Sequence, residues 1–98
     1  MKYEHINEII KKHGIVAQSM IAMEECSELI QAISKCIRSK EVIPTETREH
    51  LVEEMADVLI CLEQLQAMYY ITNEELSEWM NKKEERLLKR EGLSNDEK

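Results

Sequence analysis

Ninety-eight residues with a mass of 11.6 kDa are enough for one domain and too few for two. Hydrophobic residues make up 43% of the chain and charged residues 34%, whereas Gly occurs twice, Pro once and Phe not at all. Sandwiches and barrels need turn residues and aromatic side chains, so this composition favours an all-α fold. A formal net charge of −7 disfavours a broad grip on the phosphates of a nucleic acid.

From the sequence we expect neither a membrane span nor a leader. No run approaches the ~18 apolar residues of a span, and the first residues lack the apolar stretch of a signal peptide. We therefore expect a cytoplasmic protein that binds no membrane and no nucleic acid. Its cysteines, Cys26, Cys36 and Cys61, lie among apolar neighbours without C-x-x-C spacing, which predicts free thiols in the core rather than disulfides or zinc ligands.

The first half of the chain predicts two helices. The first covers residues 3–12 and ends at Gly14, which can take the left-handed conformation that stops a helix. The second covers about residues 15–38, a stretch without Gly or Pro that is rich in good helix formers.

Two more helices follow the break before Pro44. Thr45 is expected to cap the third, which runs to about residue 69 or 70. Thr72 and Glu75 have the spacing of a capping box, so the fourth helix starts there and continues to about residue 90. We expect one helical domain over residues 1–92 and a frayed tail over residues 93–98.

Two of these helices carry acidic pairs in stripes that are otherwise apolar. On a helical wheel Glu25 lies within the stripe of the second helix, and Glu28 lies at its edge; Glu54 and Asp57 fall similarly on the third. Buried carboxylates cost several kcal/mol apiece unless cations or protons neutralise them. Because oxygen ligands suit a hard divalent ion, the pattern predicts a Mg²⁺ site.

Other interpretations of these acids stay open. A single acidic pair is usually part of a solvated helix face, and only the recurrence on two helices favours a metal. A di-iron site is disfavoured because no His stands three residues after any of the four acids. His50, one turn before Glu54, is either an additional ligand or a polar residue at the margin of the helix.

The predicted fourth helix directs cations to the same side as its apolar residues. Its stripe consists of Leu76, Met80 and Leu87. Lys83 falls in the middle of the stripe, with Trp79 and Arg86 beside it. Lys83 and Arg86 are therefore candidates for phosphate binding. The alternative is that Lys83 snorkels to solvent or pairs with an acid.

The sequence EECSE at residues 24–28 is followed after twenty-five residues by EMAD at residues 54–57. This double motif resembles the EExxE…ExxD signature of the MazG-like nucleotide pyrophosphohydrolases, an all-α superfamily. The resemblance implies a four-helix bundle completed by homo-oligomerisation, as a dimer or tetramer. It also implies hydrolysis of a (d)NTP between the α and β phosphates to a (d)NMP and pyrophosphate. The implied ligands of Mg²⁺, for which Mn²⁺ can substitute, are Glu25, Glu28, Glu54 and Asp57.

Other positions are assigned around this implied centre. Glu24 or Glu53 would orient the attacking water, while Gln18 would hydrogen-bond a base and Trp79 would stack on one. Two alternative functions stay open at this point: a phosphoribosyl-ATP pyrophosphohydrolase, and a non-catalytic helical interaction module that retains the fold.

Overall fold

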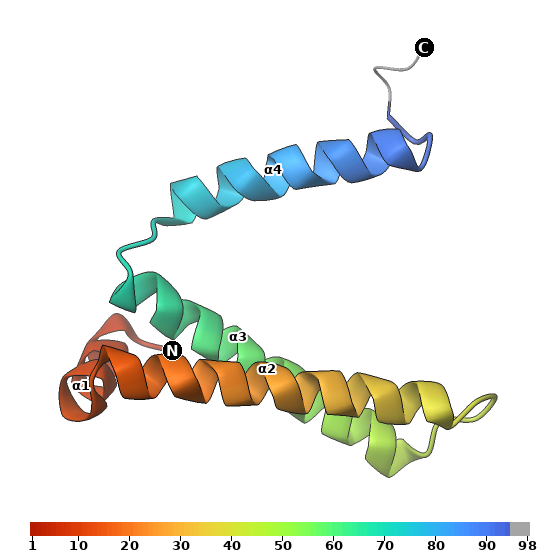
Figure 1. Ribbon diagram of the computed structural model, residues 1–98, viewed down its shortest axis with the longest axis horizontal. Coiled ribbons are helices and arrows are strands. Elements are labelled where there is room, and N and C mark those ends of the chain that lie inside the picture. Colours follow the sequence, from red (N-terminus) through yellow and green to blue (C-terminus); the bar gives the residue numbers. More distant parts are fainter. Residues whose placement is uncertain (95–98) are drawn as a thin grey trace.

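The computed structural model describes residues 1–94, over which the chain forms four α-helices and no strand (Figure 1). The helices are α1 (Tyr3–His13), α2 (Ile15–Arg38), α3 (Thr45–Met68) and α4 (Asn73–Arg90). The predicted all-α class is confirmed, and the helix boundaries agree with expectation to within one or two residues. Of the expected frayed tail, residues 95–98 lie outside the described part of the chain.

The helix ends follow the predicted chemistry at two of three positions. Gly14 has φ +88° and its N–H donates to the carbonyl of Ile10 at 2.7 Å, so it ends α1. At α4 the capping box is complete: the N–H of Glu75 donates to Thr72 Oγ1 at 3.1 Å, and the N–H of Thr72 donates to Glu75 Oε2 at 2.9 Å.

The expectation that Thr45 caps α3 is wrong. Pro44 occupies the capping position, and no side chain caps this helix. The carbonyl of Pro44 accepts a hydrogen bond from the N–H of Arg48 at 3.0 Å. The helix therefore starts one residue earlier than a Thr cap would require, and Thr45 is its first residue.

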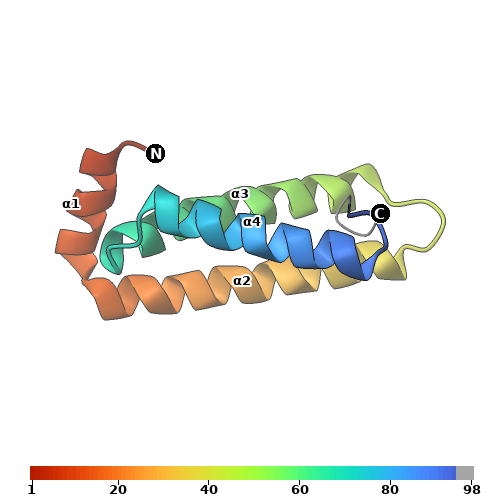
Figure 2. The same ribbon diagram turned by 90° about the horizontal axis from the view of Figure 1, so that it is seen from above.

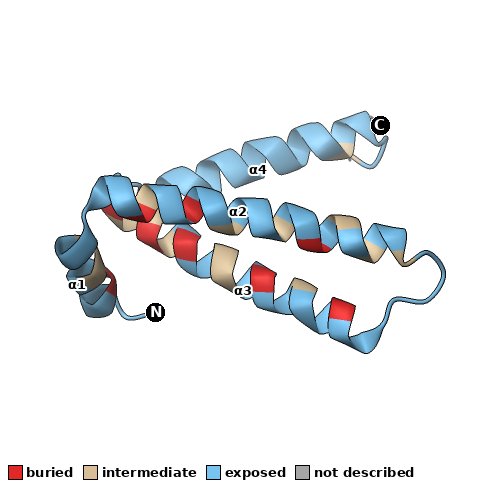
Figure 3. Ribbon diagram, turned by 60° about the horizontal axis from the view of Figure 1, so that its bottom comes forward, coloured by how far each residue is buried: buried red, intermediate tan, exposed pale blue. Residues whose placement is uncertain are grey.

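α2 and α3 form an antiparallel pair, here called the α2–α3 hairpin, and share most of the contacts between helices (Figures 1 and 2). Their buried residues lie on the facing sides, as Figure 3 shows. Small side chains at Ala22 and Ala32 on α2 let α3 approach closely, where Cys61 and Met68 are also buried. α1 crosses one end of the hairpin and contributes the buried Ile6.

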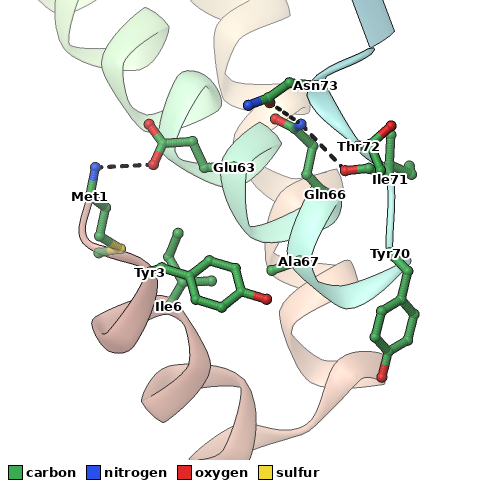
Figure 4. A pocket seen from close by; sticks show the side chains of 10 residues that line it. All are labelled: Met1, Tyr3, Ile6, Glu63, Gln66, Ala67, Tyr70, Ile71, Thr72 and Asn73. Atoms are coloured by element: carbon green, nitrogen blue, oxygen red, sulfur yellow. Dashed lines mark hydrogen bonds and ion pairs between the residues drawn. The ribbon is translucent and has the colours of Figure 1, made fainter. Parts of the chain in front are cut away.

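The connection from α3 to α4 is a tight turn beside the start of the chain. Tyr70 adopts φ +55°, and the N–H of Ile71 donates to the carbonyl of Gln66 at 2.9 Å. The side chain of Gln66 also donates to Asn73 Oδ1 at 2.9 Å, which ties the first residue of α4 to α3 (Figure 4). A pocket of about 430 Å³ lies at this junction.

α4 leaves the hairpin at this turn and runs apart from it (Figures 1 and 3). It buries no residue. The stripe that was expected to face a core therefore has no core to face within one chain.

The cysteines are free, as expected, but only Cys61 is a core residue. Cys36 is half-buried and Cys26 is exposed, so the expectation of core thiols holds for one of the three positions. Among the described residues, none of the helices combines the length and the apolar character needed to cross a membrane.

Candidate functional site

Three carboxylates meet in the middle of the α2–α3 hairpin. Glu25 of α2 faces Glu54 and Asp57 of α3, and one oxygen from each lies within 4.8 Å of the other two. Glu54 is only 5% exposed, while Glu25 and Asp57 are half-buried. We call these three residues the acidic cluster. It arises because the inward faces of two helices each carry acids at the same level of the hairpin.

The protein leaves part of this cluster unsatisfied. The Oε2 atoms of Glu25 and Glu54 are both inaccessible to solvent, and neither has a hydrogen-bond partner among residues 1–94. Beside Glu54 lies the imidazole of His50, whose Nε2 is 3.9 Å from Glu54 Oε1. Buried carboxylate oxygens without partners are uncommon in stable folds, so the chemistry of the cluster suits a positively charged ligand.

The pKa values of two of these acids also indicate an excess of negative charge in the cluster. Burial raises the pKa of Glu25, and the carboxylates of Glu28, Asp57 and Glu54 raise it further. Burial likewise raises the pKa of Glu54, with Glu28 and Asp57 adding to the effect and His50 opposing it. Since the causes that raise these pKa values outweigh those that lower them, the site gathers more negative charge than the protein compensates.

The donor set fits a hard divalent cation. The cluster offers oxygen atoms only, which is the preference of Mg²⁺ and Mn²⁺. Cys61 lies close to the cluster, but burial raises the pKa of its thiol above the ordinary value of 9.0, so the thiol stays protonated near neutral pH and is a poor ligand. Glu25, Glu54 and Asp57 are therefore the residues that would hold a metal.

Glu28 belongs to the margin of the site. It is exposed and is not one of the three converging acids. Its carboxylate is nevertheless close enough to raise the pKa of both Glu25 and Glu54. Of the four acids predicted as metal ligands, the structure thus brings three together and leaves the fourth at the edge.

Gln18 lies in the hairpin about two turns before Glu25 on α2. It is 4% exposed, and its Nε2 donates to Gln64 Oε1 at 3.3 Å. Sequence reasoning missed Gln64, although it stands seven residues after Asp57 and so on the same helix face. Both amides face the inside of the hairpin, and each is partly satisfied by the other.

The remaining predicted residues do not gather at the acidic cluster. Glu24 and Glu53 are exposed and directly precede Glu25 and Glu54 in the chain. On α4, Lys83, Arg86 and Trp79 are exposed. The Arg86 guanidinium lies 5.9 Å from the centre of the Trp79 ring, while the ammonium of Lys82 lies 4.9 Å from it. Within one chain, therefore, the aromatic ring contacts cations of its own helix.

Sequence reasoning also missed a polar pocket of about 360 Å³ beside the acidic cluster. We call it the polar pocket; its lining residues are Glu28, Gln31, Ala32, Lys35, Arg38, His50 and Glu54. The available signal was helical spacing, because Lys35 follows Glu28 by seven residues and so shares its face of α2. The pocket places two cations on the same side of the hairpin as two of the acids.

Comparison with known proteins agrees with this geometry. The sequence model of the MazG nucleotide pyrophosphohydrolase domain matches residues 17–91, which include all of α3 and α4 and all but the first two residues of α2. Neither curated proteins nor solved structures provide a match to the chain. The family match covers most of the sequence and both acidic motifs. The chain therefore belongs to the MazG nucleotide pyrophosphohydrolase family.

Proposed function

We propose that the protein hydrolyses a nucleoside triphosphate, ribo or deoxy, between the α and β phosphates and releases a nucleoside monophosphate and pyrophosphate. One observation carries this proposal beyond the family match. The orphaned, inaccessible oxygens of Glu25 and Glu54 converge with Asp57 inside the hairpin, and this arrangement is costly unless it serves a cation. A cation there is positioned to receive phosphates.

We propose Mg²⁺ as the ion, with Mn²⁺ as a substitute, held by Glu25, Glu54 and Asp57 and approached by Glu28 at the margin. When bound, such an ion neutralises phosphate charge and lowers the pKa of a water. The chain positions the acids on two packed helices, and His50 Nε2 lies 3.9 Å from Glu54 Oε1. Glu24 and Glu53 remain candidates for orienting the water.

The proposed activity has a direct test. Purified protein is incubated with each of the eight common NTPs and dNTPs, and with phosphoribosyl-ATP, and pyrophosphate release is measured with Mg²⁺ and with excess EDTA. We expect release from at least one triphosphate with Mg²⁺ and none with EDTA. Release from phosphoribosyl-ATP alone would select the alternative substrate. Binding of Mn²⁺ without any hydrolysis would select a non-catalytic module.

We also propose that the working form is a homo-oligomer. Along α2, apolar side chains recur every seven residues on a face that one chain leaves uncovered: Val16, Met23, Ile30 and Ile37, each at least 67% exposed. A sustained heptad of this kind is typical of helices that pack on another helix. α4 carries its own uncovered stripe in the same chain. A second copy therefore supplies two complementary apolar surfaces.

In such an assembly Lys83 and Arg86 need not reach the acidic cluster of their own chain. They can reach that of a second copy, where they would meet phosphates as predicted. The oligomer is tested with Ile30→Glu, which places a charge in the α2 stripe, and Ile30→Leu, which conserves it. By sedimentation velocity we expect the Leu variant to retain the oligomer and the Glu variant to be monomeric. A monomeric wild-type protein would exclude this proposal.

A further inference from the structure

The polar pocket has opposite charges at its two ends. Glu28 and Glu54 line the end that adjoins the acidic cluster, while Lys35 and Arg38 line the other. The α2 residues are spaced along one helix, so that the rise from Glu28 is about 10 Å to Lys35 and about 15 Å to Arg38. Helical side chains lean toward the N-terminus of their helix, which directs both cations back toward Glu28.

The two cations, Lys35 and Arg38, do not form ion pairs with acidic side chains within the described residues. The basic side chain beside Glu54 is His50, whose Nε2 lies 3.9 Å from Glu54 Oε1. Arg38 donates a hydrogen bond to the hydroxyl of Ser34 at 3.0 Å, which fixes its direction and leaves the rest of its donors available. Opposite charges thus share a pocket without neutralising one another.

A second observation supports a ligand in the pocket. Glu54 lines the pocket and is only 5% exposed. Its Oε2 atom has no hydrogen-bond partner among the described residues. A carboxylate in that state calls for a cation at the cluster end of the pocket. The excess positive charge at the other end calls for an anion. A ligand that joins a bound cation to Lys35 and Arg38 must carry several negative charges along its length.

We propose that Lys35 and Arg38 bind the two terminal phosphates of the substrate, so that the polar pocket is a diphosphate subsite. The identity of the ligand as part of a nucleotide rests on the proposed function. A volume of about 360 Å³ lies at the lower end of the range of ligand pockets, about 300–1,000 Å³, and suits part of a nucleotide. Lys35 supplies a point charge and Arg38 a fork that can hold two phosphate oxygens.

The subsite has consequences for selectivity. A nucleoside monophosphate lacks the groups that Lys35 and Arg38 hold, so it should bind weakly. Pyrophosphate fits the subsite by itself and should inhibit the reaction as a competitor of the triphosphate. These cations belong to the hairpin, so their contribution needs neither α4 nor a second copy.

The test uses Lys35→Ala, Arg38→Ala and the double variant in the full chain. Arg48→Ala is the matched control, because it removes an exposed cation from the same end of the hairpin without touching the pocket. Inorganic pyrophosphate is titrated into each protein in the presence of Mg²⁺ by calorimetry. Mn²⁺ alone is titrated separately to report on the acidic cluster, and circular dichroism reports on helix content.

We expect pyrophosphate affinity to fall at least tenfold in the double variant and to stay within twofold in Arg48→Ala. Mn²⁺ affinity should stay the same or increase, since only cations have been removed. In kinetics, KM for the triphosphate should rise and inhibition by pyrophosphate should weaken in parallel. Pyrophosphate affinity in the double variant within twofold of wild type would overturn the subsite, as would a wild-type protein that binds no pyrophosphate.

The same measurements distinguish failure of the proposed hydrolytic activity from failure of the diphosphate subsite. If wild-type protein releases pyrophosphate from no nucleotide, while Lys35→Ala and Arg38→Ala still weaken its binding of pyrophosphate, the anion subsite stands and the hydrolytic activity does not. If hydrolysis occurs with unchanged kinetics in the double variant, the activity stands and the subsite does not.

Discussion

The α2–α3 hairpin and α4 look alike as sequences and differ in the folded chain. Both carry an apolar stripe interrupted by charge, acidic in the hairpin at Glu25 and Glu54 and basic in α4 at Lys83. The hairpin buries its stripe, including Glu54, whereas α4 buries nothing. An interrupted apolar stripe therefore indicates that a helix face packs against another surface. It does not indicate whether that surface belongs to the same chain.

The difference also separates two kinds of charged residue. In the hairpin, burial and like charges raise the pKa of Glu25 and Glu54 before any ligand binds. The cations of α4 are exposed to water, which screens them and lowers their influence. We therefore expect the acids to dominate both stability and activity, and the α4 cations to contribute a smaller effect.

The largest effect is expected at Glu25. Glu25→Gln removes one of the three converging carboxylates while keeping the shape of the side chain. Turnover should fall by about 100-fold or more, since even changes around a metal's ligands cost 10- to 100-fold. In EDTA the variant should melt a few degrees higher than wild type, because repulsion between the carboxylates is relieved.

Thermal melts with and without Mg²⁺, combined with pyrophosphate release, measure both halves of this prediction. Mg²⁺ should raise the midpoint of wild type more than that of Glu25→Gln. Glu8→Gln, an exposed acid of α1, serves as the control and should change neither quantity. Full activity in Glu25→Gln, without a higher midpoint in EDTA, would remove Glu25 from the metal centre.

A smaller effect is expected from α4. Lys83→Ala should raise KM for the triphosphate by about tenfold, a loss typical of one charge-assisted contact, and should leave helix content unchanged. Lys89→Ala removes an equally exposed cation from the same helix and should have no effect on KM. Steady-state kinetics of both variants decide the matter. A KM of Lys83→Ala equal to that of wild type would show that Lys83 is only a solvated residue, and Arg86 would then be tested next.

The pH dependence of stability contrasts the hairpin with the rest of the chain. Because the pKa values of Glu25 and Glu54 are raised in the folded protein, the folded state holds more protons than the unfolded state just above the ordinary carboxyl pKa of 4.5. Stability should therefore fall as pH rises from that value through the raised pKa values. Melts in EDTA should show a lower midpoint at pH 8 than near pH 5.5.

Glu25→Gln should flatten this pH profile, whereas the Lys83→Ala profile should keep the slope of wild type. Mg²⁺ should also flatten the profile, because an occupied cluster favours the deprotonated acids. A wild-type midpoint that rises steadily between pH 5.5 and pH 8 in EDTA would contradict the charge excess assigned to the hairpin.

The smallest effect concerns the turn that separates the two regions. Tyr70 adopts φ +55°, a left-handed conformation that strains the backbone of a residue with a Cβ. Its side chain is 89% exposed, so packing contributes little to offset that strain. Tyr70→Gly should stabilise the chain by about 0.5–1 kcal/mol in urea unfolding. Tyr70→Ala removes the same ring without relieving the strain and should give no gain. Equal stabilities of the Gly and Ala variants would show that the turn conformation carries no strain.

Much of the fold could be predicted from the sequence because its causes are local. The end of α1 follows from Gly14, the start of α4 from the Thr72–Glu75 capping box, and the length of α2 from its lack of Gly and Pro. The miss at Thr45 is local as well, since Pro44 takes the capping position. The inward placement of Glu25, Glu54 and Asp57 followed from helical periodicity on each helix separately.

What the tertiary structure decided is which faces meet. Only the packing of α2 against α3 brings Glu25 within reach of Glu54 and Asp57, leaves Glu28 at the margin and places Lys35 and Arg38 in the polar pocket. It also places α4 away from the hairpin. Helical periodicity tells which side chains share a face of one helix, because hydrogen bonds within the helix fix their spacing. The choice between faces on different helices depends on contacts between distant parts of the chain, and no local pattern encodes them.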